Sequence, residues 1–297
     1  MEKKKLILLI GSNGNLGYAI KNKLKKKTYH KKFAFKKDID LEKLSSIPKY
    51  LKKINPKYII NAAAYTNVDK AEKNMKLCYK INALAPKKIA DWAYKNESIL
   101  IHFSTDYIFN GKNKKPLTEK NKTQPTNFYG KSKLDGEKFI INSKCKYFIL
   151  RISWLYSERK RNFPQKIIKK IMNKSKIFIV NDQLGAPTHV DFVSDITLKI
   201  LEKIIINPNI NSNIFHISPK GYISYYNWAK KIHQKLTKYK KCKIIPISLE
   251  QIQSGAKRPK NSVFNSSKIE KFLDYKIPNW EKTFQKKIGK IIKNCIT

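Results

Sequence analysis

The sequence predicts an α/β fold built on a doubly wound parallel sheet. In the first half of the chain, short apolar runs alternate with stretches that suit helices, which is the pattern of parallel strands joined by crossover helices. The first apolar run ends in a glycine-rich turn, and 297 residues suffice for one large domain or two smaller ones. We therefore expect a Rossmann-like sheet and a smaller, mixed α/β domain toward the C-terminus.

The first predicted strand, Leu6–Ile10, leads into the turn 11–17, and a helix is expected over Tyr18–Lys27. Glycines three apart let the backbone pass close to a pyrophosphate and let the helix pack on the strand. The helix N-terminus then offers its amides to the phosphates. The turn therefore predicts dinucleotide binding, with a tight structural turn as the alternative; its glycines are Gly11, Gly14 and Gly17.

This motif sets the expected domain boundaries. Residues 1–152 form the predicted dinucleotide-binding domain, with part of 175–206 added back to it. Residues 153–174 and 207–297 form the predicted substrate-binding domain, which covers the carboxyl ends of the strands, where such sheets bind ligands.

The second strand is expected over Phe33–Phe35. An NAD site usually has an acid at the end of this strand, and none follows immediately. The flanking lysines suit a 2′-phosphate, so the sequence favours NADPH and leaves NADH open; these lysines are Lys31, Lys32, Lys36 and Lys37.

The third predicted strand, Tyr58–Ile60, ends in small residues, Asn61-Ala62-Ala63-Ala64. Small side chains at the end of a strand let a flat ligand lie against the backbone, although they also suit ordinary helix–sheet packing.

The fourth predicted strand, Ile99–Ile101, leads into the hydroxyls and carboxylate of 104–107. Tyr129 and Lys133 follow four residues apart, so they share one face of a helix. A lysine beside a phenol favours the phenolate, which we expect to lower the pKa of Tyr129. A solvated helix face is the alternative, because the chain is rich in Tyr and Lys.

The fifth strand, Tyr147–Leu150, is expected to end near Trp154, which would form either a stacking wall for a sugar or base or a part of the core. Helices are expected over Phe163–Met172 and Val193–Ile206, with a strand over Ile177–Val180 between them.

The net charge of +43 raises the possibility of a nucleic-acid partner. However, 64 Lys and Arg residues include only four arginines, the residue that phosphate and base contacts favour, and the lysines are spread throughout the chain. We therefore expect no nucleic-acid partner. We also expect no membrane span, since no apolar run approaches ~20 residues, and no bound metal or disulfide, since the four cysteines are scattered and no histidine has ligand spacing.

Nine motifs in this order resemble the dTDP-4-dehydrorhamnose reductase family of the extended short-chain dehydrogenase/reductases, and they span almost the whole chain. They are the turn at 11–17, NAAAYTNVDKAE (61–72), STDYIFNG (104–111), YGKSKLDGE (129–137), RISWLY (151–156), VNDQLGAPT (180–188), HISPKGYISYYNWA (216–229), KRPKNSVFNSSKI (257–269) and IPNWEKTF (277–284).

The resemblance implies NAD(P)H-dependent reduction of the C4 ketone of dTDP-4-dehydro-β-L-rhamnose. It makes Tyr129 the general acid, Lys133 its partner and Thr105 a second hydrogen-bond donor to the carbonyl. Strand alternation is expected to turn Thr105 and Ser104 to opposite sides, and we assign the role to Thr105. The implied cofactor residues are Gly11, Gly14, Asn15, Leu16, Gly17, Asp38, Ile39, Ala63, Ala64, Thr66, Phe103, Tyr129 and Lys133; the implied substrate residues are Thr105, Asp106, Tyr129, Trp154 and Arg258.

We expect a cytoplasmic protein, because the N-terminal apolar run is short and leads into a glycine turn, not into a signal-peptide cleavage site. The resemblance implies a small nucleotide sugar as substrate, and either a monomer or a homodimer is expected. Some members of the family dimerise around Mg²⁺ held by surface carboxylates, one of them at the position of Asn15, so a Mg²⁺-bridged dimer is not expected here. The open alternatives are a reductase or epimerase of another nucleotide sugar and a silent regulatory relative, which would have no reason to keep Thr105, Tyr129 and Lys133 together.

Overall fold

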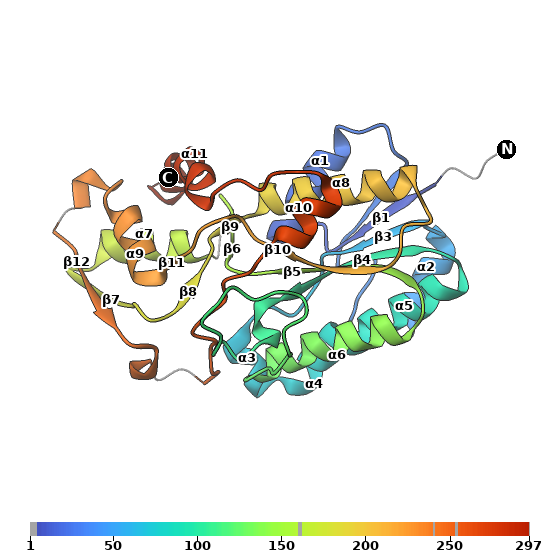
Figure 1. Ribbon diagram of the computed structural model, residues 1–297, viewed down its shortest axis with the longest axis horizontal. Helices are drawn as coiled ribbons and strands as arrows, with labels where there is room; N and C mark the ends of the chain where they lie inside the picture. Colours follow the sequence, from blue (N-terminus) through green and yellow to red (C-terminus); the bar gives the residue numbers. More distant parts are fainter. Residues whose placement is uncertain (1–4, 160–161, 240, 253–254, 297) are drawn as a thin grey trace.

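The structure is a computed structural model that describes residues 5–159, 162–239, 241–252 and 255–296. Its centre is a six-stranded sheet in the order β10-β5-β4-β3-β1-β2, with every neighbouring pair parallel (Figure 1). The strands are β1 (Ile7–Ile10), β2 (Lys31–Ala34), β3 (Tyr58–Asn61), β4 (Ile99–Thr105), β5 (Lys146–Ile152) and β10 (Asn213–Ile217).

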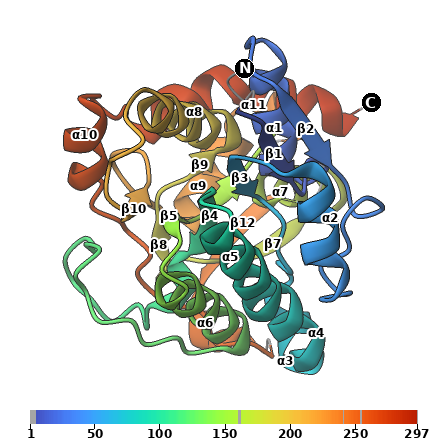
Figure 2. The ribbon, with the colours of Figure 1, turned by 90° about the vertical axis from the view of Figure 1, so that its right-hand side faces the viewer.

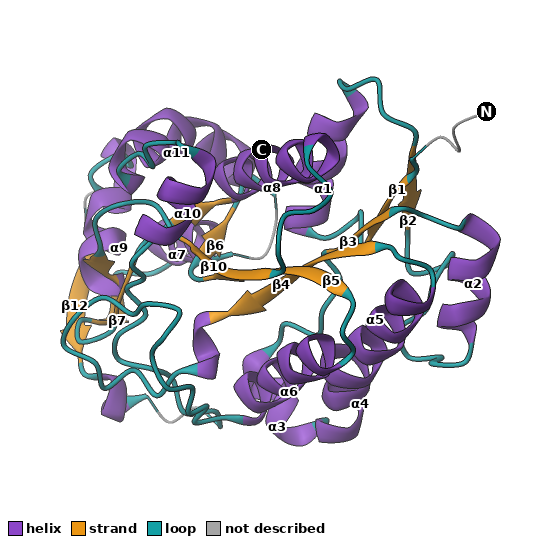
Figure 3. Ribbon diagram, turned by 45° about the vertical axis from the view of Figure 1, so that its right-hand side comes forward, coloured by secondary structure: helices purple, strands orange, loops and turns teal. Residues whose placement is uncertain are grey.

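The central strands are apolar on both faces because helices cover both. Every residue of β1, β3 and β4 is buried, as expected for a parallel sheet between two helical layers. Figures 2 and 3 show α1, α8 and α10 on one face and α2, α5 and α6 on the other. These helices are α1 (Asn15–Lys25), α2 (Ser46–Ile54), α5 (Ala85–Lys95), α6 (Phe128–Asn142), α8 (Val190–Ile206) and α10 (Ser267–Leu273).

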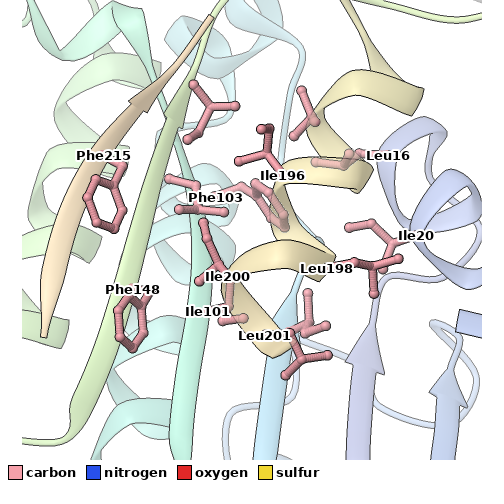
Figure 4. Packing of buried hydrophobic residues seen from close by; sticks show 14 of the residues in the cluster. Leu16, Ile20, Ile101, Phe103, Phe148, Ile196, Leu198, Ile200, Leu201 and Phe215 are labelled. Atoms are coloured by element: carbon pink, nitrogen blue, oxygen red, sulfur yellow. The ribbon is translucent and has the colours of Figure 1, made fainter. Parts of the chain in front are cut away.

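The core on the first face is built around α8. Ile196 and Ile200 of α8 belong to one buried cluster with Phe103 of β4, Leu16 of α1 and Phe215 of β10 (Figure 4). Burying such side chains contributes about 1.5–3 kcal/mol each. This packing holds the glycine turn before α1 against the carboxyl end of β4.

A helical run with a π-helical turn follows β3 on the other face. Asn82 of the π turn is buried; its Oδ1 accepts from the Tyr65 amide (2.9 Å) and its Nδ2 donates to the Tyr65 carbonyl (3.0 Å). The π turn thereby fixes the loop that leaves β3. The run comprises α3 (Val68–Lys73), α4 (Met75–Tyr79), the π turn η1 (Lys80–Leu84) and α5; the 3₁₀ turn η2 (Asp106–Ile108) follows β4.

A smaller lobe lies beyond the carboxyl ends of the strands, at the left of Figure 1. Three two-stranded pairs, β12-β7, β11-β8 and β6-β9, are packed with helices around an aromatic cluster that includes Trp228 and Trp280. Its elements are β6 (Leu155–Tyr156), α7 (Phe163–Asn173), β7 (Lys176–Val180), β8 (Leu184–Gly185), β9 (Thr188–His189), β11 (Ile223–Ser224), α9 (Tyr225–His233), η3 (Thr237–Tyr239), β12 (Lys243–Ile247), η4 (Leu249–Gln251) and α11 (Trp280–Ile296).

The predicted fold class, a doubly wound parallel sheet with a smaller mixed lobe, is confirmed. The chain is shared between the two parts differently from the predicted boundaries. Strand β10 and helix α10, within 207–297, belong to the large sheet, because β10 pairs with β5 and α10 packs on it. Of the range 175–206, only part of which was expected in the large domain, α8 packs on the large sheet and β7 pairs with β12 in the smaller lobe. Within the described ranges, no helix combines the length and apolarity needed to cross a membrane.

Candidate active site

A cavity of about 720 Å³ lies at the carboxyl edge of the large sheet and is lined by residues of both parts of the molecule. Its walls come from the glycine turn, the ends of β3, β4 and β5, the start of α6, and helices α7 and α9. It brings together most of the residues that the sequence singles out: Gly11, Gly14, Asn15, Leu16, Ala63, Ala64, Thr66, Phe103, Thr105, Asp106, Tyr129, Lys133 and Trp154.

The glycine turn fits the close approach of a bulky anion. Gly11 has φ +79°, and a Cβ there would lie 2.7 Å from the Ala63 nitrogen. Helix α1 begins at Asn15, inside the motif, so its free amides face the cavity. Gly17 does not line the cavity; a Cβ on it would lie 2.1 Å from the Gly11 carbonyl oxygen, so this glycine permits α1 to pack on the turn.

Tyr129 lies in the first turn of α6, which Asn127 caps by accepting a hydrogen bond from the Gly130 amide (2.7 Å). The phenol packs edge-on against Tyr107 and hydrogen-bonds to Thr105. Burial raises the pKa of Tyr129 above its usual value, and the hydrogen bond to Thr105 opposes this only in part. The structure therefore differs from the expected lowering of this pKa, because desolvation of the phenolate outweighs other influences.

Lys133, one turn later, is buried, and its Nζ donates to the Phe103 carbonyl (2.7 Å) and lies 3.1 Å from Nε2 of His102. Burial lowers the pKa of Lys133 to about 8, because a charged ammonium is poorly solvated there.

Asp106 is buried beside Thr105. Its Oδ1 accepts from the Thr105 hydroxyl (3.1 Å) and its Oδ2 from the Ser262 hydroxyl (2.5 Å). Burial raises the pKa of Asp106 to about 6 in spite of these hydrogen bonds. Ser104 also borders the cavity, but its hydroxyl is buried without a hydrogen-bond partner among the described residues, whereas the Thr105 hydroxyl bonds to Asp106.

Aromatic rings form the wall opposite the strand ends. Trp154 stacks on Tyr225 with ring centroids 3.7 Å apart and planes 8° from parallel. Trp154 has φ +46°, and Gly185 leaves the space for its indole, since a Cβ on Gly185 would lie 2.3 Å from Trp154 Cε2. From the sequence, Trp154 could belong either to the core or to a stacking wall of the site. In the structure Trp154 lines the cavity, with Trp228 beside it.

Three other predicted site residues lie outside the cavity lining. Asp38 accepts a hydrogen bond from the Phe35 amide (2.8 Å), which closes the turn after β2. Ile39 is buried in the core on the other face of the sheet. Arg258 forms two hydrogen bonds to Asp69 (2.9 and 2.8 Å), and its charge acts on Tyr107 at the cavity wall.

Several lining residues escape the sequence analysis because only the tertiary fold brings them to the site. Tyr225 and Trp228 lie three apart on α9, a spacing that equally suits a core face. Asn162 and Phe163 enter from α7 and its N-cap, in the other lobe. The motif at 216–229 contains Tyr225 and Trp228 and is the signal that could have found them, whereas no quoted motif contains Asn162 or Phe163. Lys36, one of the lysines expected near a 2′-phosphate, and Ala62, one of the small residues after β3, also line the cavity. The lining residues without a predicted role are Asn13, Phe35, Val68, Ser104, Tyr107, Ile152, Ser153, Leu155, Asn162, Phe163, Lys166, Tyr225 and Trp228.

Comparison with known proteins settles the family. A family model described as the RmlD substrate binding domain matches residues 4–292. The chain belongs to the RmlD family. A dTDP-4-dehydrorhamnose reductase of Salmonella typhimurium is 29% identical over 290 residues, covering 93% of this chain and 94% of that protein. The recognised family and the enzyme class, an oxidoreductase, are thereby confirmed.

Solved RmlD structures extend the similarity to three dimensions. The dTDP-4-dehydrorhamnose reductase of Clostridium acetobutylicum is 33% identical with a TM-score of 0.88, over 96% of this chain and 98% of that one. The Bacillus anthracis dTDP-4-dehydrorhamnose reductase, solved in complex with NADP, is 32% identical with a TM-score of 0.86, over 95% and 98% of the two chains. A likeness in fold alone extends to MoeE5, at 16% identity and a TM-score of 0.80.

One group of possible metal ligands in the described part of this RmlD chain is already occupied by a lysine ammonium. Among the described residues, Glu158, His189 and Asp191 offer ligand atoms within 4.8 Å of one another. The ammonium of Lys287 already bonds to both carboxylates, 3.0 Å from Glu158 Oε1 and closer still to Asp191. Asn15 stands at the position where the resemblance implies a Mg²⁺-binding carboxylate, and it brings an amide in place of that charge. The absence of a metal stays a prediction.

Proposed function

We propose that this chain is an NADPH-dependent reductase that converts the C4 ketone of dTDP-4-dehydro-β-L-rhamnose to the alcohol of dTDP-L-rhamnose. One observation carries the proposal: a single cavity is lined by a glycine cradle for a dinucleotide, by Thr105, Tyr129 and Lys133, and by an aromatic wall. The RmlD relatives named for this reaction support the choice of substrate.

The cofactor would lie along the carboxyl edge of the sheet. Backbone amides of the glycine turn and of α1 would hold its pyrophosphate. Phe35 and Lys36 line the adenosine end, where Asp38 and Ile39 were expected. The Lys36 ammonium is largely exposed and pairs with Glu42 (2.5 Å), and an exposed pair of this kind costs little to exchange for a 2′-phosphate. This favours NADPH, with NADH as the alternative. Ala63, Ala64 and Thr66 would border the ribose and phosphates, and Phe103 the nicotinamide.

Bound NADPH supplies the hydride, and the protein's own residues supply the proton. Because its pKa is raised, Tyr129 is protonated at neutral pH, as a proton donor must be. Its hydroxyl would donate to the ketone oxygen together with Thr105, and the charge of Lys133 would stabilise the phenolate that remains. Lys133 would also hold the nicotinamide ribose.

The sugar and nucleotide would lie between the strand ends and the smaller lobe. Asp106 offers carboxylate oxygens to sugar hydroxyls, and Trp154 with Tyr225 offers an aromatic surface. Arg258 lies beside Tyr107 at the rim of the cavity. Its guanidinium, which bonds to Asp69, would bind a substrate phosphate favourably in place of that carboxylate. The net charge of +43 attracts such anions at low salt.

The test is turnover of the substrate. Protein is mixed with NADPH and dTDP-4-dehydro-β-L-rhamnose, and loss of absorbance at the reduced-nicotinamide band is followed. A dTDP-6-deoxy-D-sugar ketone with the same nucleotide is the control. Turnover of the L-sugar alone is expected; equal turnover of the D-sugar ketone, or none of either, would contradict the assignment.

A further inference from the structure

Two residues that the reaction scheme does not use lie behind Lys133. The Nε2 atom of His102, on β4, is 3.1 Å from Lys133 Nζ. The Nδ1 atom of His102 is 3.2 Å from Nδ2 of Asn61, its register partner on β3. All three side chains are at most 1% exposed. Asn61 and His102 therefore form a buried relay that ends on Lys133.

The other end of the relay reaches the cavity wall. The backbone amide of Ala63, which lines the cavity, donates to Asn61 Oδ1 (3.2 Å). A backbone N–H only donates, so this bond fixes which way the Asn61 amide points. Its Nδ2 then donates to His102 Nδ1, which must be an acceptor.

The tautomer of His102 follows from this polarity. Burial and the charge of Lys133 hold the pKa of His102 well below its usual value, so the imidazole is neutral and carries its one proton on Nε2. That N–H points at Lys133 Nζ. An uncharged amine accepts such a bond with its lone pair, and an ammonium does not.

The other groups near Lys133 do not fix its amine in either the charged or the uncharged state. Burial raises the pKa of the Cys78 thiol from α4, so the thiol is neutral. Glu137, one turn along α6, favours the charged amine, but its carboxylate is bound by Arg151 (2.7 Å). Tyr129 lies one turn earlier. With the pKa of Lys133 lowered to about 8, both charge states are accessible.

We propose that Asn61 and His102 are positioning residues that couple the charge of Lys133 to the cofactor site. While Ala63 N–H is bound to Asn61, the relay favours the uncharged amine. When a cofactor oxygen takes that N–H, the Asn61 amide can turn round and accept from an Nδ1–H imidazole, whose free Nε2 then accepts from the Lys133 ammonium. The imidazole carries one proton in both states, so the change takes up one proton from solvent, and that proton resides on Lys133 Nζ.

This coupling rests on the proposed cofactor site, and the tautomer measured without cofactor tests the relay separately from that site. The chain has five histidines, and ¹⁵N-histidine labelling with long-range ¹H–¹⁵N correlation reports the tautomer of each one. His102→Gln assigns the His102 signal. Above the lowered pKa of Lys133, at about pH 9, the Nε2–H tautomer is expected without cofactor, and the Nδ1–H tautomer with saturating NADPH. An Nδ1–H tautomer without cofactor, or no change when NADPH binds, would overturn the proposal.

An isosteric variant tests the relay without emptying its space. In Asn61→Asp, the carboxylate can only accept, so it takes both the Ala63 N–H and an imidazole Nδ1–H. His102 is then expected in the Nδ1–H tautomer even without NADPH. Retention of the Nε2–H tautomer in this variant would contradict the relay, whether or not the protein proves to be a reductase.

Calorimetry of NADPH binding in buffers of different ionisation enthalpy measures the proton uptake. At pH 8 the wild type is expected to take up to about half a proton more than His102→Leu, because Lys133 is then about half charged. The matched control is His216→Gln, a buried histidine beside Arg151 that does not line the cavity, and its uptake should equal that of the wild type. Equal uptake in His102→Leu and wild type would refute the coupling.

Discussion

The buried ion pair between Glu137 and Arg151 fixes the catalytic helix to the sheet. Arg151 of β5 donates from Nε (3.1 Å) and Nη2 (2.7 Å) to the two carboxylate oxygens of Glu137, and the side chains are 5% and 1% exposed. Glu137 lies on α6 two turns beyond Tyr129, on the same face as Lys133. Replacing Glu137 by Leu would leave a permanently charged guanidinium buried without its partner.

The expected loss is large because only one charge is removed. Breaking a buried pair in this way costs about 3–5 kcal/mol. Unfolding entropy of about 2.1 cal/mol/K per residue gives about 0.6 kcal/mol/K for 297 residues. Glu137→Leu should therefore lower Tm by about 5–8 °C.

Urea and thermal denaturation of a double-mutant cycle measure the effect. The cycle comprises Glu137→Leu, Arg151→Met and the double variant. The double variant should be more stable than the sum of the single losses predicts, since it leaves no uncompensated charge buried. A loss below about 1 kcal/mol in Glu137→Leu, or strict additivity in the cycle, would refute this account of the pair.

Three further outcomes test the site. In Gly17→Ala, the new Cβ would lie 2.1 Å from the Gly11 carbonyl oxygen, so the Kd for NADPH by fluorescence titration should rise by about tenfold or more; an unchanged Kd would contradict the cradle. In Gly185→Ala, the Trp154 indole must move, so KM for the nucleotide sugar should rise about tenfold while the NADPH Kd stays constant; a change in Kd alone would contradict the assignment of that wall to substrate. Because the pKa of Asp106 is raised from 3.8 to about 6, its carboxyl stabilises the fold fully below pH 3.8 and loses that contribution as the pH rises through 6. The free energy of unfolding of Asp106→Asn minus that of the wild type should therefore increase with pH, by up to about 3 kcal/mol between pH 4 and 7 in urea denaturation. A difference that does not change with pH would show that burial does not raise this pKa.

Much of the fold was predictable because parallel strands buried on both faces carry apolar runs that no surface strand would have. The predicted runs Leu6–Ile10 and Ile99–Ile101 are such runs, and they fall in strands β1 and β4, both inside the sheet. Their carboxyl ends necessarily share one edge, which is why the glycine turn and Tyr129 meet in one cavity. The assignment of β10 to the large sheet was not predictable, because pairing with β5 depends on contacts distant in sequence.

The site was predictable where chemistry and local spacing coincide, and less so where the tertiary fold decides. Tyr129 and Lys133 share a helix face, so their spacing shows in the sequence. His102 is hidden inside an apolar strand, and only the register with Asn61 reveals its role. The sequence predicts a lowered pKa for Tyr129, and this prediction is wrong because burial raises that pKa. Composition carries no information on how deeply the phenol is buried.

The central claim is that Tyr129 supplies the proton for ketone reduction in this cavity. The most direct measurement is the turnover of dTDP-4-dehydro-β-L-rhamnose by Tyr129→Phe, with NADPH binding measured on the same preparation. The account predicts that kcat falls by about 10²–10⁴-fold while the NADPH Kd stays nearly constant. Turnover equal to that of the wild type would contradict it.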